Sequence, residues 1–273
     1  MPAVSVIIPS YNLGRYIGET LQSVKNQTFQ DWECLVVENG SSDNSRDVIH
    51  EFVSVDARFK LIPLVSNVGV AQARNTALHR CLGRYILFLD ADDIIGPGYM
   101  EAAVAALEED PSVNVVYARA ERFGEETKWD LPPFDMSTML SRNCLYVTSF
   151  FRKAEYDLYY GKGFDLEFVN GYEDWDFWLS LFEALPGEPK VLQLPEVYFF
   201  YRTRKGSRNT GVSDEALKEI RLRLWQKHKS LYARYFPDPL ETVEYRRLKR
   251  AFDKASRTPC WKLRMAVKKM LGR

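Results

Sequence analysis

Three carboxylates within four positions, Asp90, Asp92 and Asp93, directly follow the apolar run 85–89. Carboxylates this close repel one another, so the cluster needs a cation or bound protons to neutralise part of its charge. Oxygen ligands of this kind suit a hard divalent ion such as Mg²⁺ or Mn²⁺. Such a metal can neutralise a departing diphosphate. The alternative is a solvated turn, because Asp is common where strands end in turns.

A second acidic pair, Glu173-Asp174, opens an apolar segment of helical spacing that contains Trp175 and Trp178. One interpretation is a general base that removes a proton from an attacking hydroxyl. The other is helix capping, because acids in a first helical turn stabilise the helix dipole. The tryptophans indicate core packing more readily than a platform for a sugar ring, although one of them could stack on a sugar.

Two further groups of residues could bind a charged or aromatic ligand. Four bases, including Arg202 and Arg204, lie within 201–208 and could close over a diphosphate, although an exposed basic loop is the alternative. Near the amino terminus, an aromatic ring and amides occur together in 9–12 and 39–40 and could hold a nucleobase. A plain turn explains the same residues. Arg74 follows on an Ala-rich helical pattern and could reach this region.

The first half of the chain alternates strand and helix patterns. Apolar, β-branched runs predict strands at 4–8, 33–37, 59–63 and 85–89. Apolar spacing predicts intervening helices over 16–24, 48–53 and 70–82. Strands this apolar are typical of a parallel sheet covered on both faces. Ligands of such sheets gather at the carboxyl ends of the strands, which places 9–12, 38–40 and 90–93 along one rim.

The second half is less regular. A helix is predicted over 97–109, strands over 113–118, 146–152 and 197–202, and a helix over 175–182. The polar, Pro-containing stretch 121–134 indicates a loop. From residue 213 onward the pattern is helical and charged.

In combination, these motifs resemble family 2 glycosyltransferases, the inverting nucleotide-sugar transferases of the GT-A fold. The resemblance spans roughly residues 3–210 and is carried by 4–12, 21–28, 39–43, 67–69, 73–75, 85–93, 163–165 and 173–176. It implies a Rossmann-like α/β fold with a mostly parallel sheet flanked by helices. The expected organisation is a catalytic domain over 1–212, divided into a nucleotide-sugar half (1–110) and an acceptor half (111–212), followed by a helical basic extension over 213–273.

The resemblance also implies roles for the acidic residues. Asp174 occupies the place of the catalytic base, with Glu173 and Trp175 beside the acceptor. Asp90-Ala91-Asp92 occupies the place of the acidic motif that binds the donor, with Asp92 as the principal metal ligand and Asp90 nearer the ribose. The implied cofactor is Mn²⁺ or Mg²⁺, held by Asp92 and Asp90.

Further donor contacts are implied for the remaining motifs. Pro9, Tyr11 and Asn39 match positions that line the nucleobase, and Arg74 matches a basic position on the donor side. Arg202 and Arg204 match a late segment that folds over the pyrophosphate. Two departures stand out. Many relatives carry two acids at Glu38-Asn39, and many carry a histidine at Arg204, which cannot itself ligate a metal.

Charge separates the body of the chain from its tail. The 273 residues contain 37 Lys/Arg and 37 Asp/Glu, so a globally basic nucleic-acid binder is disfavoured. Eleven of the bases and one of the acids lie in 245–273, where two short amphipathic helices are predicted. Such helices can lie on anionic lipid or pack on the catalytic domain. The four scattered cysteines and the lack of a secretory or membrane-spanning pattern favour a cytoplasmic location, with contact at the inner face of the membrane in the lipid-binding case.

The resulting hypothesis is a metal-dependent hexosyltransferase of surface-polysaccharide or glycolipid biosynthesis. Its partners would be a UDP-, dTDP- or GDP-linked sugar and a glycan or glycolipid acceptor, with no nucleic acid. The competing hypotheses are a metal-dependent nucleotidyltransferase or phosphatase and a non-catalytic sugar-nucleotide binding protein.

Overall fold

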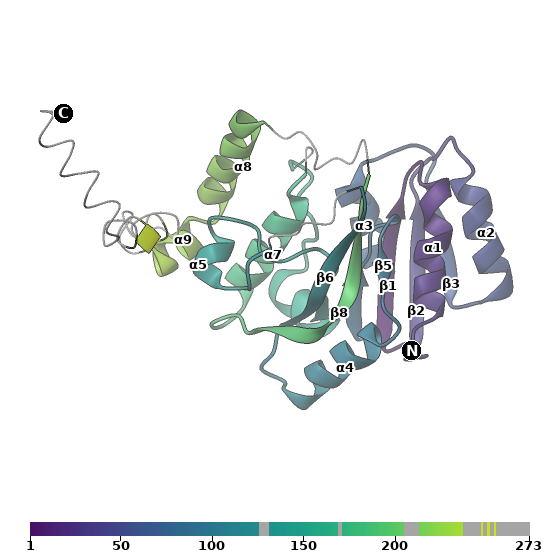
Figure 1. Cartoon of the computed structure of the whole chain (residues 1–273), viewed down its shortest axis with the longest axis horizontal. Coiled ribbons are helices and arrows are strands. Elements are labelled where there is room, and N and C mark those ends of the chain that lie inside the picture. The colour runs from purple at the N-terminus through teal and green to yellow at the C-terminus, as the bar shows by residue number, and fades with distance from the viewer. Residues whose placement is uncertain are drawn as a thin grey trace, which may run out of the picture.

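The computed structural model describes residues 1–125, 131–168, 171–204 and 213–236, and the single residues 247, 250, 251 and 254. Within these residues, eight strands form one sheet in the order β3-β2-β1-β4-β7-β6-β8-β5, with helices packed along it (Figure 1). The predicted α/β class, with a sheet flanked by helices, is confirmed.

The first four strands form the parallel part of this sheet. They are β1 (Val4–Ser10), β2 (Trp32–Glu38), β3 (Phe59–Pro63) and β4 (Tyr85–Phe88). The helices α1 (Gly14–Lys25), α2 (Ser45–Val55) and α3 (Val70–Leu78) connect them. All four predicted strands are confirmed. The third helix ends four residues earlier than predicted, because the chain must turn at Gly83 to enter β4 against the backbone of β1.

The rest of the sheet is mixed in direction. The strand β7 (Phe150–Arg152) pairs antiparallel with β4 and with β6 (Val115–Gly124). The strand β8 (Val191–Thr203) runs parallel to β6, and the short β5 (Ile94–Ile95) pairs antiparallel with β8. The loop predicted from 121 was wrong at its start, because β6 continues to Gly124 through its pairing with the end of β8. The strand predicted over 146–152 is shorter, at 150–152, and the one predicted over 197–202 is longer.

The remaining helices surround the mixed part. They are α4 (Tyr99–Glu109), α5 (Met136–Met139), α6 (Lys153–Glu155), the π-helical turn η1 (Tyr156–Tyr160), α7 (Glu173–Ala184), α8 (Asp214–Lys227) and α9 (Lys229–Tyr235). The predicted helix at 175–182 is confirmed as α7, which begins two residues earlier, so that Glu173 and Asp174 form its first turn.

Two buried apolar clusters lie on the two faces of the sheet. In β1, Ile7 packs in one cluster while Val6 and Ile8 pack in the other, as the two-residue period of a strand requires. Leu224 of α8 and Leu231 of α9 are buried in the same cluster as Ile7. The two helices therefore pack on the body that carries α7, and the division at residue 212 stays a prediction.

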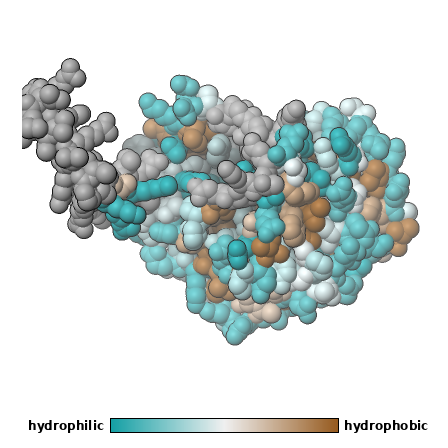
Figure 2. Space-filling model, in the orientation of Figure 1, coloured by the Kyte–Doolittle hydropathy of each residue, from teal (hydrophilic) through white to brown (hydrophobic). Residues whose placement is uncertain are grey.

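The surface and the tail bear on the membrane hypothesis. Within the described part, no helix is both long and apolar enough to cross a bilayer. Figure 2 shows a mostly hydrophilic face with hydrophobic residues in separate patches. The rest of the predicted basic loop, 205–208, lies outside the described residues, as do most residues of the two helices predicted over 245–273. Of that tail, only 247, 250, 251 and 254 are described, and these are helical and exposed.

The close approach at Gly83 provides a test of the fold. A Cβ atom at this position would lie 2.6 Å from the carbonyl carbon of Val4. We therefore expect Gly83→Ala to lower the free energy of unfolding by about 1–3 kcal/mol in urea titrations, as overpacking does. Gly187→Ala is the matched control, because a Cβ there meets nothing within 4 Å, and we expect a change within about 0.5 kcal/mol. Equal effects of the two substitutions would contradict the close approach of Gly83 to the backbone of β1.

Candidate active site

A cavity of about 510 Å³ opens at the carboxyl ends of β1, β2 and β4. Eight of the residues predicted for donor binding line it: Pro9, Tyr11, Asn39, Asp90, Ala91, Asp92, Arg202 and Arg204. The predicted rim is thus one continuous surface. Tyr11, with 43% of its surface exposed, is its accessible aromatic ring. Such a volume falls in the range of small-molecule and cofactor sites.

The cavity also has walls for which the sequence predicted no role. One is the turn 67–72 before and within α3, and another is formed by Leu166 and Phe168. The first wall contains the motif 67–69 and the second follows the motif 163–165, both of which carry the family resemblance, and that neighbourhood was the available signal. Their contribution is shape and apolar surface, which a search for charged side chains overlooks.

The acidic motif at the end of β4 keeps the mutual repulsion that its sequence predicts. Burial and the neighbouring Asp90 raise the pKa of Asp92, although Arg204 opposes the shift. Burial together with Asp92 and Asp90 raises the pKa of Asp93 well above its usual range. The crowding of these carboxylates therefore favours bound protons or a cation at this end of the cavity.

Two arginines contact this motif, Arg202 within the end of β8 and Arg204 directly after it. Nε of Arg204 donates to Oδ2 of Asp92 at 2.8 Å. The backbone N–H of Arg202 donates to Oδ1 of Asp93 at 2.8 Å, and its Nε donates to the backbone carbonyl of Asp92 at 2.7 Å. The guanidinium of Arg202 also stacks over the ring of Phe123, with its carbon 4.3 Å from the ring centroid. The end of β8 is thus held against the acidic motif.

Arg74 of α3 joins the two acidic signals of the sequence. Its Nη2 lies 2.6 Å from Oδ1 of Asp90, and its Nη1 lies 2.8 Å from Oε1 of Glu173. Only 1% of Arg74 is exposed, and it does not line the cavity. Burial alone lowers the pKa of Arg74, but the charges of Asp90 and Glu173 outweigh it and raise that pKa. Arg74 therefore connects the acidic motif to the start of α7.

Asp174 follows Glu173 in the first turn of α7 and has the properties of a base. Its Oδ1 accepts a hydrogen bond from the backbone N–H of Trp175 at 2.8 Å, and its Oδ2 accepts one from Nδ2 of Asn143 at 3.3 Å. Burial and the charge of Glu173 raise the pKa of Asp174 to about 7, against the opposing charge of Arg74. A carboxylate with a pKa near the working pH is suited to proton abstraction. Asp174 does not line the 510 Å³ cavity, and Arg74 and Glu173 link the two.

Two predicted contact residues direct their polar groups into the protein. Trp175 is 1% exposed, and its indole N–H donates to the carbonyl of Met139 at 2.6 Å, which favours the core interpretation. The Nδ2 of Asn39 donates to Oδ1 of Asn67 at 3.0 Å, and its Oδ1 accepts from the backbone N–H of Val68 at 2.9 Å. Asn39 thus shapes the cavity wall at 67–69, and contacts of either residue with a ligand stay predictions.

The buried position of Arg74 gives a stability prediction. Replacing it by Gln leaves Glu173 and Asp90 without their shared cation, and breaking a buried ion pair in this way costs about 3–5 kcal/mol. We expect Arg74→Gln to lower the unfolding free energy by that amount in denaturant titrations. Arg84→Gln, which removes the exposed pair with Glu108, should change it by less than about 1 kcal/mol. A loss no larger for Arg74 than for Arg84 would contradict the bridge.

The chain is 46% identical over 92 residues, 34% of this chain and 36% of the relative, to TuaG of Bacillus subtilis, a candidate glycosyltransferase of teichuronic acid biosynthesis. It is 36% identical over 144 residues, 52% of this chain and 56% of the relative, to WfgD of Escherichia coli, a UDP-Glc:α-D-GlcNAc-diphosphoundecaprenol β-1,3-glucosyltransferase. The chain thus spans 56% of the length of WfgD and 36% of the length of TuaG.

Solved glycosyltransferases share the fold. TarS of Staphylococcus aureus in complex with UDP-GlcNAc superposes with a TM-score of 0.68 at 19% identity, covering 90% of this chain and 78% of that one. The mannosyltransferase PcManGT of Pyrobaculum calidifontis, in complex with GDP-Man and Mn²⁺, gives a TM-score of 0.59 at 17% identity, covering 100% and 88%. At these identities the likeness establishes the GT-A type of fold.

The family model described as glycosyl transferase family 2 matches residues 5–167, which is more than half of the chain. That stretch contains the cavity turn 67–69, Arg74 and the acidic motif, and it ends at the wall formed by Leu166 and Phe168. The predicted resemblance is therefore confirmed, and the chain belongs to glycosyl transferase family 2.

Proposed function

We propose that the chain is an inverting, metal-dependent glycosyltransferase. It transfers a hexose from a nucleoside-diphosphate sugar to a hydroxyl of a glycan or glycolipid during surface-polysaccharide or glycolipid biosynthesis. The observation that carries the proposal is the ion bridge through Arg74, which ties the acidic motif at the cavity to the helix turn that bears Asp174. The names of TuaG and WfgD support the polysaccharide and glycolipid context.

The donor occupies the 510 Å³ cavity in this proposal. The nucleobase lies against Tyr11 and Pro9, beside the turn that Asn39 holds in place. Asp90 is nearer the ribose, and the diphosphate faces Arg202 and Arg204. UDP-, dTDP- and GDP-linked sugars all carry this diphosphate. A solved relative of this fold binds UDP-GlcNAc and another binds GDP-Man, which supports a donor of this class.

A divalent cation fits the donor set at the acidic motif. Among the described residues, no three His, Cys, Asp or Glu side chains form a ready-made metal cluster. Asp92 and Asp90 nevertheless offer carboxylate oxygens of the kind that Mn²⁺ and Mg²⁺ prefer. The raised pKa of Asp92, caused by burial and by Asp90, reflects negative charge that a cation would relieve. When bound, the cation would neutralise charge on the leaving diphosphate.

The chemical step in this proposal is a single displacement. Asp174 accepts the proton of the acceptor hydroxyl, and that oxygen forms a bond to the anomeric carbon as the bond to the diphosphate breaks on the opposite face. The configuration at the anomeric carbon is therefore inverted. Arg202 and Arg204 stabilise the negative charge that develops on the diphosphate. Arg74 acts through Glu173, since it fixes the first turn of α7 relative to the cavity.

In this proposal the enzyme acts in the cytoplasm and at the inner face of the membrane. A lipid-linked acceptor, such as the one in the name of WfgD, would be met there. The basic tail over 245–273 would supply contact with anionic lipid.

Substitutions at Asp174 and Asp92 separate proton abstraction from donor binding. We expect Asp174→Asn to abolish hexose transfer while the Kd for UDP or GDP, measured by calorimetry with Mn²⁺, changes by less than about twofold, because only the base is lost. Asp92→Ala should weaken nucleotide binding in Mn²⁺ and leave the binding in EDTA nearly unchanged. Asp157→Asn is the control, because Asp157 is an exposed partner of Lys153 outside the cavity. Full turnover by Asp174→Asn would remove Asp174 from its role.

The raised pKa of Asp174 predicts the pH dependence of transfer. The base is the ionised carboxylate, so kcat/KM should rise as pH increases through about 7 and level off above it. Initial rates between pH 5 and pH 9 under subsaturating donor measure this. A rate already on its plateau at pH 5 would mean that Asp174 titrates near the ordinary value of 3.8 or is not the base.

A further inference from the structure

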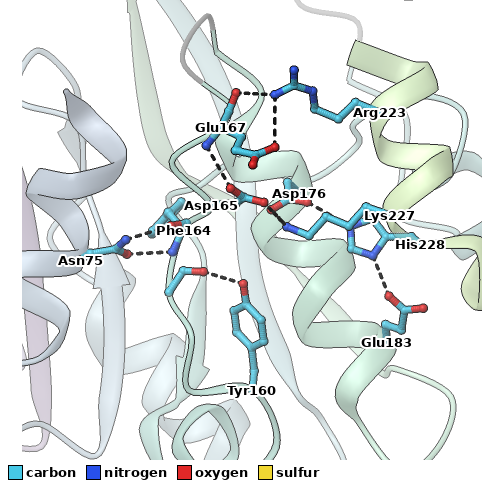
Figure 3. A network of polar contacts seen from close by, with 11 residues as sticks. Asn75, Tyr160, Phe164, Asp165, Glu167, Asp176, Glu183, Arg223, Lys227 and His228 are labelled. Carbon is cyan, nitrogen blue, oxygen red and sulfur yellow. Dashed lines mark hydrogen bonds and ion pairs between the residues drawn. The ribbon is translucent and has the colours of Figure 1, made fainter. Parts of the chain in front are cut away.

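The loop 163–168, called the wall loop here, forms one side of the donor cavity through Leu166 and Phe168. It has no regular secondary structure, since η1 ends at Tyr160 before it. Its shape therefore depends on side chains from other elements, and Figure 3 shows those contacts.

One end of the wall loop is fixed by α3. Nδ2 of Asn75 donates to the carbonyl of Phe164 at 2.8 Å, and the backbone N–H of Phe164 donates to Oδ1 of Asn75 at 2.7 Å (Figure 3). Gly163 allows this close approach, because it has φ +77° and a Cβ there would lie 2.9 Å from Cγ of Asn75. Asn75 is the neighbour of Arg74, so this end of the loop is tied to the bridge.

The other end of the wall loop is held by α8. Nζ of Lys227 lies 2.6 Å from Oδ2 of Asp165, and Nη1 of Arg223 donates to the carbonyl of Glu167 at 2.7 Å (Figure 3). Both cations also lie over the ring of Phe168, at 5.6 Å for Lys227 and 5.8 Å for Arg223. Phe168 is thus contacted by two cations of α8, a helix that lies outside the residues matched by the family model.

Lys227 also contacts α7, the helix that carries Asp174. Its Nζ lies 2.8 Å from Oδ2 of Asp176, which is fully buried on α7, two residues after Asp174. Nε2 of His228 lies 3.0 Å from Oδ1 of the same carboxylate, and Nδ1 of His228 lies 2.7 Å from Oε2 of Glu183 (Figure 3). The buried carboxylate of Asp176 is therefore paired with Lys227 and His228, where α8 ends and α9 begins. Without these partners a buried charge there would be strongly unfavourable.

We propose that α8 completes the donor site, with Lys227 as a positioning residue that holds the wall loop on the helix that carries Asp174. Lys227 touches Asp165 and Asp176 at once, so the position of the cavity wall and that of the catalytic turn depend on the same ammonium group. The identity of the ligand rests on the function proposed above, whereas the positioning of the loop does not.

Nucleotide binding and hydrogen exchange test the proposal together. We expect Lys227→Met in the full chain to raise the Kd for UDP or GDP with Mn²⁺ by about fivefold or more, as a coupled site does, and to speed amide exchange in the wall loop. Lys227→Arg should restore most of both properties.

Lys218→Met, at an exposed base on the same helix, should match the wild type. Asp165→Asn, which leaves the sequence of α8 unchanged, should reproduce the faster exchange, and adding it to Lys227→Met should bring little further change.

The outcomes separate this inference from the proposed function. Unchanged exchange in the wall loop and unchanged Kd in Lys227→Met would overturn the positioning role, even if the melting temperature falls. A wild type that binds neither nucleotide would contradict the donor assignment, while faster exchange in Lys227→Met would still support the contact between α8 and the loop. If the wild type binds neither nucleotide and Lys227→Met exchanges its wall-loop amides as slowly as the wild type, the positioning role of Lys227 is overturned too.

Discussion

The arrangement of the site depends on one buried cation. Arg74 lies between a carboxylate at the end of β4 and another at the start of α7, and both contacts are shorter than 3 Å, at 2.6 and 2.8 Å. Arg74 and Glu173 are buried and Asp90 lines the cavity, so the loss of the central cation leaves two acids without their shared partner. The bridge therefore fixes a distance that apolar packing alone would leave less well defined, namely that between the acidic floor of the cavity and Asp174.

The sheet explains why such a bridge is needed. The parallel strands β1 to β4 bring the residues predicted for donor binding to one rim, as expected for ligands at the carboxyl ends of strands. The helix α7 belongs to the mixed part of the chain and reaches the rim from beside β7 and β6. Arg74 and Asn75, neighbours on α3, connect the two parts, since one holds Glu173 and the other holds Phe164. The contacts from α8 act on the same segment from the outer side.

The sequence predicted the parallel half closely, because its strands are short apolar runs between clear turns. Asp90 and Asp92 were identified because their repulsion is visible in four consecutive residues. The partner of Arg74 was not predictable, since Glu173 lies 99 residues away and a lone arginine on a helix carries no sign of its partner. The length of β6 was missed for the same reason, because its polar end is stabilised by pairing with β8. The direction of a side chain such as Trp175 depends on tertiary packing that periodicity does not encode.

A crystal structure of the complex with UDP or GDP and Mn²⁺ tests the central claim most directly. If the bridge organises the site, Arg74 will keep both carboxylates at hydrogen-bonding distance, the nucleotide will fill the cavity beside Tyr11, and Asp174 will face the space beyond the diphosphate. A complex in which Arg74 leaves Glu173 for the diphosphate, or in which the nucleotide binds away from this cavity, would contradict it.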